Sequence, residues 1–155
     1  MAKSSSNLSP TNRRQWFRIS STWLQDLMEL SPKQRLKQIK PLMEELSARL
    51  ETKGFTSELR SGLSLWILEL IEVEAQHTWR VKPVRILHPM EREFISAEAY
   101  GLFIQSLQSG IIPATESEAI LEALASKHPL PLGTHELEGY LAEYWLKQIS
   151  KYRPQ

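Results

Sequence analysis

The chain has 155 residues and a net charge of +1, which is the size of one domain with a sizeable hydrophobic core. It contains no Cys, which excludes disulfide bonds, thiolate metal ligands and a cysteine nucleophile. No stretch approaches the roughly 18 apolar residues of a membrane span, and the start "MAKSSSNLSPTNRRQWFR" lacks the apolar centre of a secretory signal. We therefore expect a soluble, cytoplasmic protein.

The small net charge hides alternating charged blocks. Residues 1–40 carry eight Lys or Arg against Asp26 and Glu29, whereas residues 96–146 carry seven Glu against one Lys. Such blocks indicate either that segments neutralise one another in the fold or that they face different partners. The chain lacks the uniformly basic composition that would point directly to nucleic acid.

The first half of the chain is predicted to be helical, with breaks at Ser, Pro and Gly. After residues 1–10, which form an expected flexible tail, apolar residues recur at helical spacing over about residues 11–30. Ser31, with a proline after it, is a suitable N-cap for the next helix. Pro41 is expected to open a further helix because proline is disfavoured in a helix interior, and Gly54 is expected to end that helix.

The stretch "KGFTSELRSGLSLWILELIE" reads as a helix stop, a turn and a new helix. Thr56 or Ser57 is the expected N-cap, and the apolar face that includes Trp66 is expected to point inward. Together with the preceding helix, this predicts a helix-turn-helix pair of winged-helix-like character over residues 41–74. The alternation in "TWRVKPVRIL" predicts a short edge strand or wing over residues 79–87.

A second helical group is predicted over residues 89–152. Gly110 is expected to end the helix in "SAEAYGLFIQSLQSG", and Gly101 is expected to permit close backbone packing. Thr115 and Glu118 have capping-box spacing, which predicts the start of the next helix. The predicted fold class is therefore mostly α: a single helical domain with a helix-turn-helix half, a short β excursion and a second helical group.

The residue types that carry catalysis or bind metals do not form a known motif. The four His include no pair at i, i+4 spacing, and the six Gly form no phosphate-binding loop. The paired Glu fall on expected exposed helix faces or in first turns, where the helix dipole favours negative charge. We therefore expect no metal site, no cofactor and no catalytic residues, and interpret the chain as a non-enzyme.

Several short motifs occur at a recognisable spacing: "GF" at 54–55, "GLSLW" at 62–66, "RI" at 85–86, "GLFIQSLQSGII" from Gly101 and "AILEALA" from Ala119. In this spacing the chain resembles the bacterial Smg family over about residues 41–146. The resemblance implies a small, cytoplasmic, mostly helical bacterial protein, in a family without an established activity. Tyr100 stands where the family has Arg before a Gly, and the acidic C-terminal tail of the family is missing, which indicates a divergent branch. The expected organisation is a flexible tail at 1–10, a basic amphipathic helical extension at 11–40 and an Smg-like helical domain at 41–152.

Two functions fit these features. The first is an accessory or adaptor protein whose basic amphipathic N-terminal region and helical core bind a protein with an acidic surface. The second is a nucleic-acid-associated factor that uses basic residues of the N-terminus and of the 79–87 strand as phosphate contacts. A membrane surface is the least favoured partner, because two acidic residues interrupt the basic segment. The candidate interaction residues are Arg13, Arg14, Trp16, Arg18, Trp23, Trp79, Arg80, Lys82 and Arg85.

Overall fold

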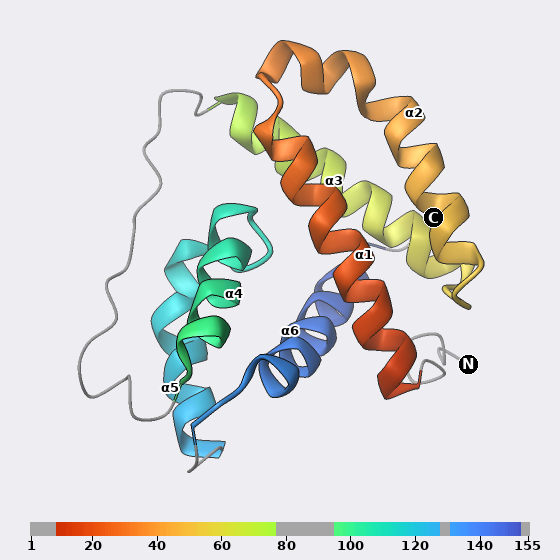
Figure 1. The fold of residues 1–155 in the computed structure, drawn as a ribbon. Helices are drawn as coiled ribbons and strands as arrows, with labels where there is room; N and C mark the ends of the chain where they lie inside the picture. Colours follow the sequence, from red (N-terminus) through yellow and green to blue (C-terminus); the bar gives the residue numbers. More distant parts are fainter. Residues whose placement is uncertain (1–8, 77–94, 128–130, 153–155) are drawn as a thin grey trace. The chain divides into compact units, whose positions relative to one another are not determined.

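The structure, a computed structural model, describes residues 9–76, 95–127 and 131–152. Over these ranges the chain forms six α helices and one 3-10 helix, and it contains no sheet (Figure 1). The elements in chain order are α1 (Pro10–Glu29), α2 (Pro32–Glu51), α3 (Ser57–Gln76), α4 (Ala97–Gln108), η3 (Ala114–Glu116), α5 (Ser117–Lys127) and α6 (Thr134–Ile149).

The mostly α fold class predicted from the sequence is confirmed, but its winged-helix-like half is not supported. The strand predicted over 79–87 lies outside the described residues. Within them, extended pairing is limited to one isolated parallel bridge between Ile95 and Leu132. The helix, Gly-Phe turn and helix are present, without a described β element beside them.

The described residues divide into two compact units. One unit contains residues 9–76 and 141–152, and the other contains residues 95–127 and 131–140, so the boundary falls inside α6. The first unit holds the basic N-terminal helices and the helix-turn-helix pair, and it is the unit in which most of the predicted interaction residues lie.

The start of α2 follows from its local sequence. The Ser31 hydroxyl accepts a hydrogen bond from the Gln34 amide at 3.2 Å, and the Gln34 side chain accepts one from the Ser31 amide at 3.3 Å. This reciprocal capping box satisfies two backbone donors that a helix start leaves free, and Pro32 at the first position needs no partner. The predicted N-cap at Ser31 is confirmed.

Pro41 does not open a new helix, so that prediction was wrong. It lies inside α2, which continues through it to Glu51. A proline removes the hydrogen bond to the carbonyl four residues earlier, here that of Lys37, and crowds that carbonyl. Buried Leu46 and Leu50 hold the helix beyond the proline. The predicted boundary between residues 40 and 41 therefore falls in the middle of one helix.

The turn after α2 has the geometry that its glycine predicts. Gly54 has a φ of 82°, a left-handed conformation that glycine adopts without strain. The Phe55 amide donates to the Leu50 carbonyl at 3.1 Å and the Gly54 amide to that of Glu51 at 3.2 Å, which is the Schellman pattern. The Thr56 hydroxyl then accepts from an amide in the first turn of α3 at 3.2 Å, so the turn has a cap on each side.

The core of the first unit is an aromatic cluster that joins α1, the Gly-Phe turn and the end of α6. The Trp16 ring stacks on Phe55 with centroids 5.1 Å apart and meets Trp145 at 5.0 Å. The Phe17 ring also packs edge-on to Trp145, with centroids 6.0 Å apart. Trp66 also contacts Trp145, at 5.2 Å, but it is only partly buried and lies at the edge of the cluster. The predicted extension at 11–40 thus supplies part of this core.

Two predictions in the second unit were wrong. Thr115 lies inside η3, and α5 begins two residues later at Ser117, so Thr115 is not the N-cap of that helix. Gly101 does not mediate close packing, because no atom lies within 4 Å of the place where a Cβ would stand. Gly110, with a φ of 90°, follows the end of α4 as expected.

A hydrogen bond joins Tyr152, which follows α6, to Glu69 of α3. The Tyr152 hydroxyl donates to Glu69 Oε1 at 2.5 Å. This bond, with burial and the carboxylate charge adding to it, raises the pKa of Tyr152 from its ordinary 10.0 to about 12. Because the folded protein holds the phenolic proton more tightly, the contact stabilises it fully below about pH 10 and is lost toward pH 12.

We expect Tyr152→Phe to lower the stability of the chain below about pH 10, and we expect this effect to shrink as the pH rises toward 12, where half of the phenol has ionised in the folded protein. Urea unfolding of both proteins across this range measures the difference. Equal stability of the two proteins at neutral pH would show that the bond to Glu69 contributes nothing.

Candidate functional site

The two N-terminal tryptophans proposed as contact residues are part of the fold. Trp16 is 0% exposed, within the aromatic cluster. Trp23 is also buried, and its indole N–H donates to the Leu42 carbonyl of α2 at 3.1 Å. The apolar face of α1 is therefore occupied by its own chain, and neither indole is accessible to a partner.

The three predicted arginines of α1 differ in exposure. Arg13 Nη1 is 3.3 Å from Glu143 Oε2 of α6, in an ion pair whose carboxylate is more than half exposed. Such a surface pair contributes up to about 1 kcal/mol. Arg14 is partly buried and Arg18 is exposed. The remaining candidates Trp79, Arg80, Lys82 and Arg85 lie outside the described residues.

One cation of the basic block has a structural role that sequence reasoning missed. Arg35 is buried at the start of α2, and its guanidinium reaches the C-terminal end of α1. Its Nη2 donates to the Leu30 carbonyl at 3.0 Å and to the Met28 carbonyl at 3.3 Å. A cation is favourable at a helix C-terminus, where carbonyl groups lack intrahelical partners. Arg35 is thus part of the α1–α2 corner.

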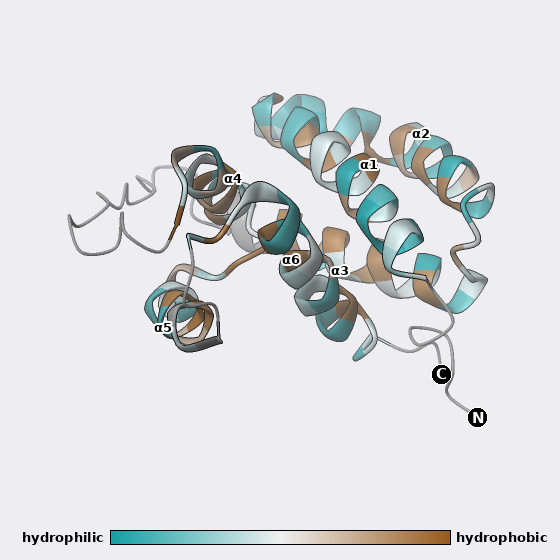
Figure 2. Cartoon of the chain, turned by 60° about the horizontal axis from the view of Figure 1, so that its bottom comes forward, coloured by the Kyte–Doolittle hydropathy of each residue, from teal (hydrophilic) through white to brown (hydrophobic). Residues whose placement is uncertain are grey.

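The first half of α2 carries three exposed lysines that are not among the interaction residues predicted from the sequence. Lys33, Lys37 and Lys40 are all exposed and follow one another at i, i+4 and i+7, so they lie on one side of the helix. Leu36 lies between them in sequence and is 65% exposed. We name these four residues the Lys-Leu face. Hydrophilic and hydrophobic residues are both visible on α2 in Figure 2. The spacing of the three lysines is visible in the sequence "PKQRLKQIKP", but the sequence does not predict that Leu36 is exposed.

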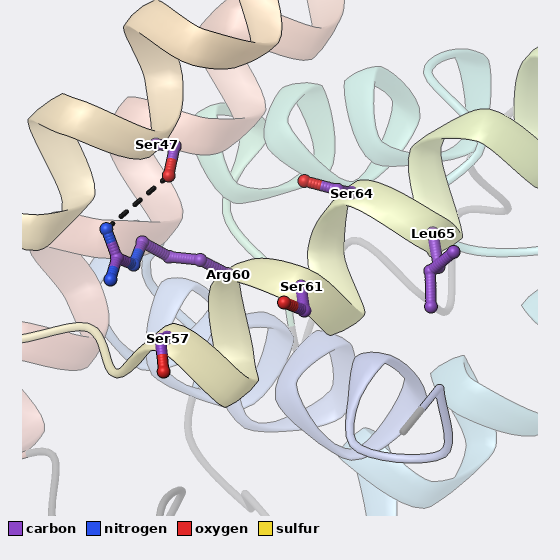
Figure 3. A pocket seen from close by; sticks show the side chains of 6 residues that line it. All are labelled: Ser47, Ser57, Arg60, Ser61, Ser64 and Leu65. Carbon is purple, nitrogen blue, oxygen red and sulfur yellow. Dashed lines mark hydrogen bonds between the residues drawn. The ribbon is translucent and has the colours of Figure 1, made fainter. Parts of the chain in front are cut away.

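An open hollow of about 520 Å³ lies between α2 and α3. Arg60 lines the hollow, and its Nη1 is 3.5 Å from Ser47 Oγ (Figure 3). The same atom is 3.3 Å from Glu51 Oε1, so two groups of α2 hold the guanidinium. The side chains that line the hollow are Ser47, Ser57, Arg60, Ser61, Ser64 and Leu65. None of them is a base that would activate a serine hydroxyl for nucleophilic attack.

A family model described as "Protein of unknown function (DUF494)" matches residues 22–138, about three quarters of the chain. The chain belongs to this family, the Smg family. The resemblance seen in the sequence is thereby confirmed. No curated protein and no solved structure matches the chain.

The Smg match begins inside α1, earlier than the start near residue 41 that the motifs indicated. It therefore includes all of α2, with both the Lys-Leu face and the α2 wall of the hollow. The first turns of α1, with Arg13, Arg14 and Arg18, precede the match.

Two further features are absent from the part of this Smg-family chain that the structure describes. Among the described residues, no group of three or more His, Asp or Glu side chains is placed to hold a metal ion. None of the described helices is both long enough and apolar enough to span a bilayer.

Proposed function

We propose that this Smg-family protein is a non-enzymatic accessory protein that binds an acidic surface of another protein through its basic N-terminal helices. The observation that carries the proposal is that the aromatic side chains of these helices are buried while most of their basic side chains are exposed. The tryptophans of α1 are buried, whereas Arg18 and the lysines of the Lys-Leu face are exposed.

The cation that holds α1 to α2 is not one of these exposed residues. Arg35, which does hold α1 to α2, is buried and hydrogen-bonded. The three lysines instead extend from a stretch of α2 that contains no acidic residue between Pro32 and Met43. Cations arranged in this way raise the rate and selectivity of association with a negatively charged surface.

Nucleic acid is the alternative partner, since the same cations can contact phosphates. The residues that favoured it most in the sequence, Trp79 to Arg85, lie outside the described part. Leu36 favours a protein, because an exposed leucine gains from covering by another apolar group and phosphates offer none.

The proposal is tested by purifying the tagged full-length chain from its own cells after nuclease treatment. We expect a specific protein to co-purify and to be lost when Arg14, Arg18, Lys33, Lys37 and Lys40 are all changed to Glu. A control variant with charge reversal at three exposed cations elsewhere in the unit should retain it.

That control changes Arg49, Lys53 and Lys147 to Glu, each of which is exposed. Association that disappears with nuclease, or that is lost equally in both variants, would contradict a protein partner at the N-terminal helices. Retention on random duplex DNA that falls steeply with salt would support the nucleic-acid alternative.

A further inference from the structure

The Lys-Leu face combines two features that folding alone does not favour. Lys33 is in the first turn of α2, where the helix dipole is positive and no acidic residue is present. A cation there is unfavourable, whereas Asp or Glu would stabilise the helix. Leu36, 65% exposed, leaves most of its side chain in water. Both residues lie on the same short stretch of helix.

The helical spacing places these groups next to one another. Leu36 is three residues after Lys33 and four residues before Lys40, and residues at these separations are neighbours on a helix surface. Lys37 lies one turn after Lys33 and completes the cationic row. The leucine is therefore flanked by ammonium groups and forms one apolar point in a positive surface.

We propose that the Lys-Leu face is a docking site for an acidic amphipathic segment of another protein. The carboxylates of that segment meet Lys33, Lys37 and Lys40, and one apolar side chain covers Leu36. This inference rests on the proposed function and adds the location of the contact and the chemistry of the partner. Charge complementarity selects an acidic partner, and the leucine selects a polypeptide, which can supply carboxylates and an apolar side chain together.

The test introduces a photo-crosslinking amino acid at Leu36 in the full-length chain and irradiates the protein in its own cells. The control position is Gln38, which is also exposed but lies roughly on the opposite side of α2. We expect a cross-linked protein from position 36 and none from position 38. Mass spectrometry should place the cross-link in a segment where Asp and Glu outnumber Lys and Arg.

A second arm places the same cross-linker at Leu36 in a chain with Lys33→Glu, Lys37→Glu and Lys40→Glu. We expect the yield to fall at least about tenfold, as reversal of three charges at one contact predicts. The melting temperature should stay unchanged or rise, because Glu at position 33 suits the helix dipole. A loss of folding together with the loss of cross-linking would contradict this separation of binding from stability.

Several outcomes would overturn the docking site. These are no product at position 36, a nuclease-sensitive product, a cross-link to a second copy of this chain, or a cross-link to a neutral or basic segment. If a partner still co-purifies in the experiment above, only the location is wrong. If no partner co-purifies, the accessory function itself fails.

Discussion

Replacing Trp16 by alanine is expected to lower the free energy of unfolding by about 3–5 kcal/mol, as large-to-small changes of buried aromatic residues do. The indole is 0% exposed and contacts both Phe55 and Trp145. Its removal leaves a cavity where α1, the Gly-Phe turn and α6 meet. Urea unfolding followed by circular dichroism measures the loss.

The matched control is Trp66→Ala in the same cluster. Trp66 contacts Trp145 but is partly exposed, so its truncation should cost clearly less, about 1–2 kcal/mol. A near-wild-type stability of Trp16→Ala would mean that α1 does not complete the core, and equal losses at the two positions would mean that the exposure of Trp66 does not reduce its contribution.

The second large effect is expected at Gly62, where α3 passes close to the end of α6. A Cβ at this position would overlap the carbonyl oxygen of Ile149 and lie 3.2 Å from that of Tyr152. Both obstacles are backbone atoms, so α3 and α6 would have to move apart. We expect Gly62→Ala to destabilise the chain by about 2–3 kcal/mol, although alanine is the better helix former.

Gly101→Ala provides the control for this experiment. Gly101 is also inside a helix, but no atom lies within 4 Å of its Cβ position and it is exposed. The same substitution should therefore stabilise the protein by about 0.5–1 kcal/mol through helix propensity alone. Opposite signs at the two glycines would confirm the close approach of α3 to α6, and stabilisation at both would disprove it.

Features set by neighbouring residues were predictable from the sequence. The N-cap at Ser31, the stop at Gly54 and the cap at Thr56 depend on backbone groups within a few residues, so their local chemistry decides them. Pro41 and Thr115 are exceptions. Packing beyond the local sequence compensates for the hydrogen bond that Pro41 removes, and Thr115 lies inside η3 and does not cap α5.

Features that depend on tertiary contacts were not predictable. Trp145 is at the centre of the aromatic cluster, whereas helical spacing in the sequence favoured its neighbour Tyr144 for the core face of this helix. The sequence does not distinguish Arg35 from the surface cations around it, because its hydrogen bond to the Leu30 carbonyl depends on how α1 packs against α2. For the same reason the candidate site moved from the tryptophans of α1, which are buried, to the lysines of α2.

The distribution of tryptophan has a spectroscopic consequence. Trp16, Trp23, Trp66 and Trp145 belong to the first unit, and the described residues of the second unit contain no tryptophan. Indole fluorescence therefore reports chiefly on the first unit, whereas the far-ultraviolet signal of the helices reports on both. Unfolding curves from the two signals will coincide if the units unfold as one, and will separate if each has its own transition.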